Sequence, residues 1–254
     1  MSRGFVCLEQ FNHATFQNQR EHKMIESESQ RLVDHAITSR RSIRAFLPTP
    51  VAQEDIRQIL AVAARAPSGT NTQPWHVYVV TGSRLQTMSQ EIVQAFLHPV
   101  PTDQFSEEYQ YYPDKWFSPY VERRRKVGFD LYGLLGLGKD DKLAMKQQHA
   151  RNFKFFDAPV GLIFTIDRNL GTGSWLDFGC FLQNVMIAAR GRDLDTCPQA
   201  AFNAYHSIIR RHTDMPDNEI MMCGMALGYA DHSKIENTLV TERESVENFA
   251  KFLD

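Results

Sequence analysis

The chain has 254 residues, of which 43% are hydrophobic and 23% charged, and its formal net charge is −2 at pH 7. This length is enough for one large core, so a single domain with insertions is the expected organisation. The near-neutral charge disfavours a nucleic-acid-binding protein, because such proteins usually carry a marked basic excess. No apolar run approaches the roughly 20 residues that span a bilayer, and no signal-peptide stretch is visible, so we expect a cytoplasmic protein without a membrane partner.

The first part of the chain predicts an arm followed by two helices. Residues 1–30 mix polar, charged and isolated aromatic residues without a clear period, and we interpret them as an N-terminal arm. Apolar residues then recur at helical spacing over Arg31–Arg40. A second helix is expected over Ile56–Arg65, with Thr49 and Pro50 as its start signal.

The most informative stretch is Ala63–Gly82, AARAPSGTNTQPWHVYVVTG. Proline at position 67 stops the preceding helix because it lacks an amide hydrogen. The following loop supplies small and amide side chains, of which Asn71 and Gln73 could instead only close turns. Trp75–Val80 is an almost continuous apolar run, which predicts a strand buried on both faces, with Trp75 more typical of the core than of a ligand contact.

The middle of the chain predicts a cover over a ligand. Ser83 can cap a helix that runs to about Phe96, after which residues 101–138 are dense in aromatics and prolines. A loop-like insertion of this length is uncommon unless it is a lid, a binding loop or disordered, and the aromatic content argues against disorder. We interpret it as a lid over a planar ligand, within an insertion of about residues 98–150, although the aromatics could also pack a satellite core. The predicted lid residues are Tyr109, Tyr112, Trp116, Phe117, Tyr120 and Arg124.

The second half returns to alternating strands and helices. Val160–Ile166 predicts a strand, and Ser174 opens a long helix that Gly191 ends and that is apolar around much of its circumference, as in a central helix or a subunit interface. DTCPQAAF predicts a proline-bearing turn, residues 203–212 a helix, and Ile220–Leu227 a strand. A short amphipathic helix is expected in the C-terminal tail.

Four donor-bearing residues fall within five positions at the end of the first predicted helix: Arg40, Arg41, Ser42 and Arg44. Planar guanidinium groups suit phosphate and polar heterocycle edges, although a surface salt-bridge cluster would have the same composition. No P-loop, GxGxxG, HExxH or GxSxG motif is present. The four cysteines, Cys7, Cys180, Cys197 and Cys223, lack paired metal spacing, so we expect reduced thiols and no metal.

Several motifs in order carry a family resemblance. RRSIRAF, APSGTNTQPWHVYVVTG, DTCPQAAF, CGMALGYAD and TER resemble the FMN-dependent nitroreductase superfamily, and YYPDKWFSPYVERRRKVGFDLYGLLG and NFKFFDAPVGLIF resemble its 4-nitrobenzoate reductase-like branch. The resemblance covers essentially residues 31–253. It implies an α+β domain over residues 31–254, with a central antiparallel sheet flanked by helices, and an intertwined homodimer with two FMN sites at its interface.

The resemblance also implies roles for individual residues. Arg40, Arg41, Ser42 and Arg44 match the first flavin-binding motif, and Pro67, Ser68, Gly69 and Asn71 match the loop that a partner subunit lays against the flavin. Pro198, Gln199, Ala200 and Ala201 match the turn whose backbone amides face the ring near N5; the chain lacks the Glu-Gly pair of some relatives there, which leaves a backbone hydrogen bond but no carboxylate. Arg243 matches the late phosphate-binding position, although it could also be a solvated charge.

The implied activity is NAD(P)H-dependent reduction of nitroaromatic compounds, by ping-pong hydride transfer through flavin N5. A guanidinium near N1 and O2 of the flavin stabilises its reduced, negatively charged form, and protons can come from water, so no catalytic protein residue is obligatory. NADPH and NADH both remain possible electron donors. Other functions stay open: reductive dehalogenation of halogenated phenols, flavin fragmentation, or a flavin-binding module without turnover.

Overall fold

The computed structural model describes residues 27–100 and 105–253. The chain divides into two compact units, residues 1–40 and residues 41–254. In the first unit a helix spans residues 27–39, and Arg40 directly follows it. Most of the arm predicted for residues 1–30 lies outside the described residues.

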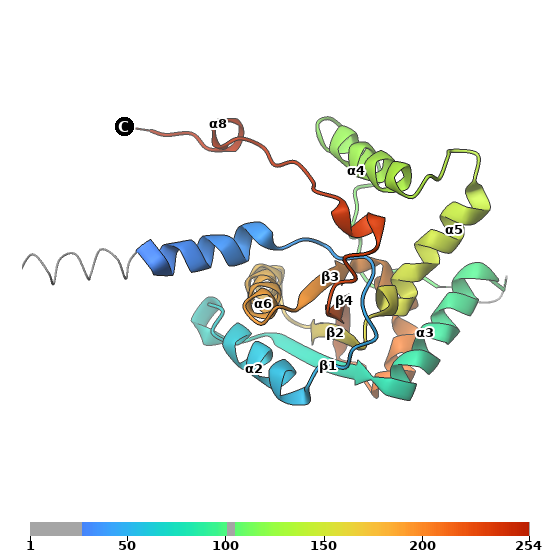
Figure 1. The fold of residues 1–254 in the computed structure, drawn as a ribbon. Coiled ribbons are helices and arrows are strands. Elements are labelled where there is room, and N and C mark those ends of the chain that lie inside the picture. Colours follow the sequence, from blue (N-terminus) through green and yellow to red (C-terminus); the bar gives the residue numbers. More distant parts are fainter. Residues whose placement is uncertain (1–26, 101–104, 254) are drawn as a thin grey trace, which may run out of the picture. The chain divides into compact units, whose positions relative to one another are not determined.

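The second unit is built on a four-stranded antiparallel sheet with the strand order β1-β2-β4-β3 (Figure 1). Three strands form where apolar runs predict them: β1 (Trp75–Thr81), β2 (Val160–Asp167) and β4 (Glu219–Gly228). The turn predicted at DTCPQAAF is wrong, because Asp195–Gln199 form a strand, β3. β3 pairs with Gly224–Gly228, and on its other side Ile43 N donates to Thr196 O over 3.1 Å.

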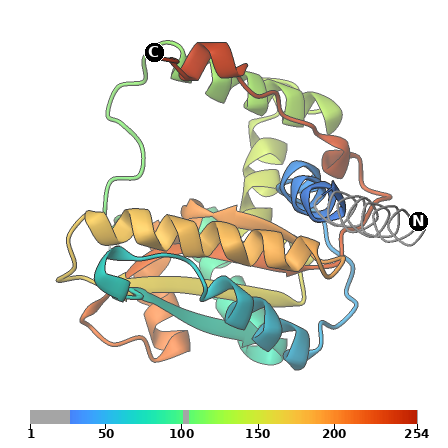
Figure 2. The ribbon, with the colours of Figure 1, turned by 90° about the vertical axis from the view of Figure 1, so that its left-hand side faces the viewer.

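Helices cover both faces of the sheet (Figure 2). The helices of the second unit are α2 (Gln53–Ala63), α3 (Gly82–Leu97), α4 (Tyr120–Leu134), α5 (Lys142–Ala150), α6 (Gly173–Arg190), α7 (His206–Thr213) and α8 (Val246–Phe249), with 3-10 turns η1 (Gly69–Asn71), η2 (Arg151–Asp157), η3 (Ala200–Tyr205) and η4 (Ile235–Thr238). Because side chains alternate along a strand, Leu162 and Phe164 of β2 pack with α2 and α6, whereas Ile163 packs with α3 and α7. The fold is therefore α+β, as the sequence predicts.

β1 is more exposed than predicted. His76 is exposed and Val79 is 42% exposed, so burial on both faces is wrong. β1 lies at the edge of the sheet and has one neighbour, β2, among the described strands. Trp75 nevertheless belongs to the core, because its ring stacks on Phe181 with the centroids 4.6 Å apart.

Two further details differ from the sequence-based expectation. Ser83 does not cap α3, since Thr81 occupies the N-cap position without a side-chain hydrogen bond. The region predicted as a loop contains a full helix, α4, which has no buried residue. We call residues 105–134, which include α4, the lid segment. Its helical character is hidden in the sequence because no apolar face of α4 enters the core.

Candidate functional site

The basic segment Arg41–Arg44 runs beside β3. Ser42 forms a parallel bridge to Thr196, and the following residue, Ile43, is buried in the core. The guanidinium of Arg44 folds back and donates to Ser42 O over 3.1 Å. β3 contains Pro198 and Gln199 and is followed directly by Ala200 and Ala201 of η3, so the first predicted flavin-binding motif runs beside the strand that carries the first half of the predicted flavin-facing segment.

Positive side chains surround a buried carboxylate at the start of β3. Asp195 is 6% exposed and pairs with Arg190, whose Nη1 lies 3.1 Å from Asp195 Oδ1. Burial raises the pKa of Asp195, and the charges of Arg190, His232 and Arg41 oppose that increase. Arg41 therefore lies within electrostatic range of this carboxylate, which partly balances the local positive charge.

The backbone of Arg44 is held by a side chain from the C-terminal part of the chain. Arg44 N donates to Asn237 Oδ1 over 2.7 Å, and Asn237 Nδ2 donates to Ala45 O and Asp231 O over 2.8 Å and 2.9 Å. Asn237 belongs to η4 and is 7% exposed. These three hydrogen bonds fix the position of the basic segment relative to η4.

Two buried polar atoms on β3 have no hydrogen-bond partner among the described residues: Thr196 Oγ1 and Gln199 Oε1. Their residues are 1% and 3% exposed, and the Gln199 amide nitrogen donates to Asn152 O over 2.7 Å. An unpaired buried polar atom is costly, so such atoms commonly serve a ligand or a water. Because Ser42 of the basic segment bridges to Thr196, these polar atoms and the basic segment flank the same part of β3, and the set fits a polar ligand such as a flavin nucleotide.

The loop Pro67–Asn71 lies against the start of α6. Gly69 N donates to Asp177 Oδ2 over 3.1 Å, and most of the loop is exposed. Gln73 closes the turn, because its backbone amide donates to Ser68 Oγ over 3.0 Å and its side chain donates to Asn71 O. Among the described residues, no hydrogen bond joins this loop to the basic segment.

Arg243 also lies apart from the basic segment. Its guanidinium donates to Thr241 Oγ1 over 2.7 Å and to two neighbouring backbone carbonyls. Together with Arg123 and Lys126 of α4 it lines a cavity of about 680 Å³. Within the second unit the structure thus brings together residues 41–44 and 198–201, and places the loop 67–71 and Arg243 elsewhere.

The predicted lid residues divide into a base and an exposed part. Tyr109, at the base, is half-buried, and its ring meets Trp175 edge-on with the centroids 4.8 Å apart. Its hydroxyl donates to Met222 O. Burial raises the pKa of Tyr109, so the hydroxyl stays protonated and remains a donor. The other lid residues form an aromatic surface in which Tyr112, Phe117, Tyr120 and Arg124 are exposed and Trp116 is half-buried. In that surface Arg124 lies 4.8 Å from the Trp116 ring centroid and 5.9 Å from that of Tyr112, while Phe117 meets Tyr120 edge-on.

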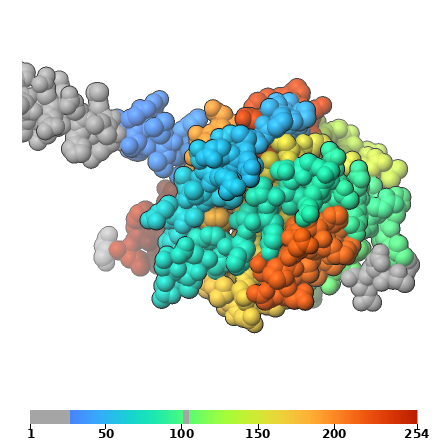
Figure 3. All heavy atoms as spheres, turned by 90° about the horizontal axis from the view of Figure 1, so that it is seen from below, coloured from blue at the N-terminus to red at the C-terminus, as the bar shows by residue number. Residues whose placement is uncertain are grey.

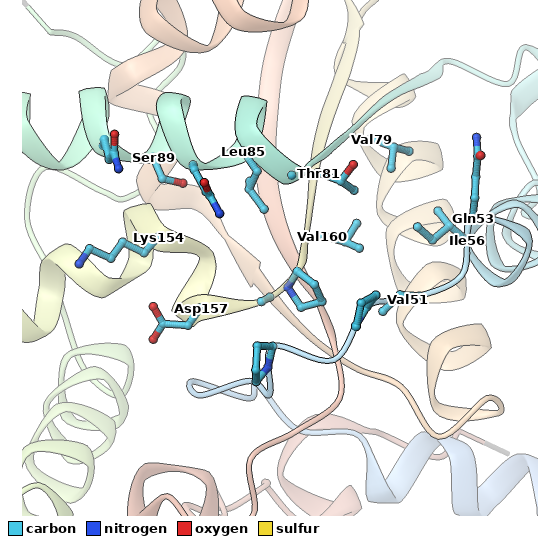
Figure 4. A pocket seen from close by; sticks show the side chains of 17 residues that line it. Val51, Gln53, Ile56, Val79, Thr81, Leu85, Ser89, Lys154, Asp157 and Val160 are labelled. Carbon is cyan, nitrogen blue, oxygen red and sulfur yellow. The ribbon is translucent and has the colours of Figure 1, made fainter.

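A separate cavity of about 900 Å³ lies at the free edge of β1 (Figure 4). Val79 and Thr81 of the strand line it, Val51 and Ile56 lie at one end, and Ser89, Lys154 and Asp157 lie toward the other. α2 and α3, which contribute to its wall, are exposed on the face shown in Figure 3. None of the predicted flavin-binding residues lines this cavity, so it marks the edge of the sheet and not the site predicted at β3.

The sequence analysis did not identify four polar residues near the basic segment, β3 and η3. Glu108, Asn203 and Asn237 make hydrogen bonds there, and Thr196 carries an unpaired hydroxyl. Weak signals exist for two of them, because Glu108 opens the aromatic run and Asn203 directly follows PQAAF. Their partners are distant in sequence, so the contacts themselves leave no local pattern. Among the described residues no group of three metal-binding side chains occurs, and no helix there is both long and apolar enough to cross a membrane.

Comparison with known proteins identifies relatives over most of the chain. The chain is 42% identical to the 4-nitrobenzoate reductase of Pseudomonas putida over 220 residues, which cover 87% of this chain and 95% of that protein. It is 39% identical to the nitrobenzene nitroreductase of Ectopseudomonas oleovorans, with 87% and 96% covered.

Solved structures with a similar fold are also nitroreductases. The FMN- and NADPH-dependent nitroreductase NfnB from Sphigopyxis sp. strain HMH superimposes with a TM-score of 0.83 at 35% identity, covering 87% of this chain and 99% of that one. The FMN-dependent NfnB of Mycobacterium smegmatis, solved with NADPH, gives the same TM-score at 27% identity, with 89% and 99% covered. A sequence model described as Nitroreductase family matches residues 37–229. On these grounds the chain belongs to the nitroreductase family.

Proposed function

We propose that this chain is a cytoplasmic FMN-dependent NAD(P)H oxidoreductase that reduces nitroaromatic compounds and works as a homodimer. One observation carries the proposal: the basic segment Arg41–Arg44 is hydrogen-bonded to β3, the strand that contains Pro198 and Gln199. The relatives named nitroreductases, two of them FMN-dependent in crystal structures, support the same conclusion.

In this proposal each group of residues has a separate task. Arg41 and Arg44 neutralise the negative charge of the nucleotide, and Ser42, Thr196 and Gln199 supply hydrogen-bonding atoms along the same edge. The first amides of η3 have no partner inside that turn and can donate to an acceptor. Arg243, which lies apart from the basic segment within one chain, adds further positive charge at the phosphate in this proposal.

FMN, when bound, supplies hydride transfer through N5 from a nicotinamide to a nitro group. The protein then has to bind the nucleotide and position the acceptor. The aromatic surface of the lid segment, with Tyr112, Trp116, Phe117 and Tyr120, is suited to cover a planar arene. No protein side chain has to act as acid or base, because water can supply the protons.

A second copy of the chain would complete the site. The loop Pro67–Asn71 is exposed in the single chain, and so are large apolar side chains on α6 and in the tail. Leu176 is 74% exposed, Phe249 71% and Phe252 84%. Exposed apolar residues of this size commonly mark a protein interface, and the open edge of β1 is another surface that a partner can cover.

The experiment that tests the function is an anaerobic absorbance titration of the purified protein. NADPH is added until the flavin band bleaches, and 4-nitrobenzoate is then added. Return of the band together with a reduced nitro product is the expected result. Return only with a halogenated phenol would favour a dehalogenase, bound flavin that NADPH cannot bleach would favour a binding module, and the absence of a flavin band would contradict the proposed site.

Steady-state kinetics test the proposed order of events. If both substrates use the same site in turn, double-reciprocal plots at several fixed NADPH concentrations are parallel. Intersecting lines would instead require both substrates to be bound together. The same measurement with NADH determines which nicotinamide is preferred.

A further inference from the structure

The lid segment begins where β4 extends beyond β3. Within β4, the residues that pair with β3 are Gly224–Gly228, so residues 219–223 of β4 lie past the end of β3. A register shift between Phe164 and Thr165 leaves Met222 without a partner on β2. Such a bulge re-aims backbone groups out of the ladder.

Two lid residues use the backbone groups at this bulge. Met221 N donates to Glu108 Oε2 over 3.0 Å, and the hydroxyl of Tyr109 donates to Met222 O. The Glu108 carboxylate lies 3.0 Å from Arg168 Nη2 and 3.6 Å from Arg210 Nη2, and its side chain is 9% exposed. A buried carboxylate with these partners is costly to detach, so the base of the lid is firmly held on β4.

The same two residues are joined to η3 by one buried amide. Asn203 is 0% exposed; its Oδ1 accepts from Glu108 N over 3.4 Å and its Nδ2 donates to Tyr109 O over 3.1 Å. Asn203 lies two residues after Ala201, the last residue of the predicted flavin-facing turn. A single side chain therefore connects the start of the lid segment to the element that continues this turn.

We propose that Asn203 is a positioning residue that couples ligand occupancy at Pro198–Ala201, the end of β3 and the start of η3, to the order of the lid base. The inference rests on the proposed function, because it assumes that flavin binds at Pro198–Ala201. A ligand that orders this segment also orders the rest of η3, and the two amide hydrogen bonds transmit that order to Glu108 and Tyr109. Binding of the nucleotide thereby orders the base of the lid segment.

Hydrogen exchange measured by mass spectrometry tests the coupling in the full chain with and without saturating FMN. In the unmodified protein FMN is expected to slow exchange in residues 105–119 at least fivefold. In Asn203→Ala this difference disappears, while the FMN dissociation constant, measured by flavin fluorescence, changes less than threefold. General destabilisation would instead raise exchange equally in both states.

Asn184→Ala is the matched control, since Asn184 Nδ2 donates to a backbone carbonyl, Ala63 O, between α6 and α2. This control is expected to retain the FMN effect on residues 105–119. If Asn203→Ala does not fold, Asn203→Asp keeps the acceptor for Glu108 N but loses the donor to Tyr109 O, and it is expected to weaken the FMN effect. The coupling is overturned if FMN slows exchange in residues 105–119 as strongly in the Asn203 variants as in the unmodified protein. It is also overturned if the unmodified protein binds flavin and exchange in these residues does not change. Absence of flavin binding would instead contradict the proposed function itself.

Discussion

Arg124 is distinguished from its neighbours on α4 by its contacts. Arg123 pairs with Glu244 and Lys126 pairs with Asp130, whereas Arg124 has no ion pair among the described residues and lies on the Trp116 ring instead. A guanidinium that lies over an aromatic ring is suited to a planar, carboxylated arene. In the proposed nitroreductase this arrangement favours a benzoate over an uncharged ring.

Replacing Arg124 with alanine is expected to raise KM for 4-nitrobenzoate about fivefold, since an exposed charge pair contributes about 1 kcal/mol. KM for nitrobenzene, which has no carboxylate, is expected to stay within twofold. Arg124→Lys keeps the charge but not the planar group and should show an intermediate effect. Equal changes for both substrates would contradict carboxylate recognition and indicate a packing role.

Arg243 tests the phosphate assignment. Arg243→Ala is expected to weaken FMN binding about tenfold, because a charge-assisted contact to phosphate contributes about 1.5 kcal/mol or more. Flavin content after dialysis, measured by absorbance, is the readout. Arg125→Ala removes another exposed arginine and should leave flavin content unchanged; equal flavin content in both variants would exclude the assignment of Arg243.

The residues that the sequence analysis identified form a local cluster, whereas those that it did not identify depend on contacts between distant parts of the chain. Arg41, Ser42 and Arg44 form a dense cluster of donors, which is visible without a structure. Asn203 and Asn237 are single polar residues whose importance lies in contacts with segments far along the chain. Such residues become recognisable only when the fold shows that their amides are buried and bonded.

Elements with a strong apolar pattern were predictable, and those without one were not. β2 and β4 are almost completely buried and stand out as continuous apolar runs, and α6 packs an apolar stripe into the core. β3 is short and contains Pro198, which the sequence reading took as a turn; a proline is tolerated here because the strand is at the end of the sheet order. α4 was missed as a helix because it has no buried face.

The packing of β4 against η3 leads to a stability prediction. A Cβ at Gly224 would lie 2.5 Å from Cδ2 of Phe202, whose ring stacks on Phe155 at 4.4 Å. Gly224→Ala is therefore expected to cost about 1–3 kcal/mol of unfolding free energy, since the stacked rings have to shift. Denaturant unfolding monitored by circular dichroism measures this change.

Gly133→Ala provides the control for that substitution. Gly133 is exposed in α4, and a Cβ there meets nothing within 4 Å. Alanine has a better helix propensity than glycine, so this variant should be as stable as the unmodified protein or more stable. If Gly224→Ala lowers the free energy of unfolding no more than Gly133→Ala changes it, η3 accommodates the added methyl group without strain.

At the scale of the whole molecule, the family resemblance predicted the antiparallel sheet flanked by helices correctly, and the homodimer remains a prediction. The expected mass in sedimentation is twice 29.2 kDa. Leu176→Glu places a charge at a side chain that is 74% exposed in the single chain and should shift the protein toward monomer and reduce flavin content. Leu143→Glu alters a similarly exposed leucine on α5 and is expected to change neither property; a monomeric unmodified protein at micromolar concentration would contradict the shared site.

The absence of buried residues from α4 has a consequence for how the protein can diversify. Substitutions in most of this helix change no core contact, so they carry little cost in folding and remain open to selection. By contrast, Glu108 and Tyr109 are bonded into the sheet and constrain the point from which the helix departs. Exchanging α4 among family members while keeping this departure point is thus a practical way to vary the proposed substrate cover on one unchanged scaffold.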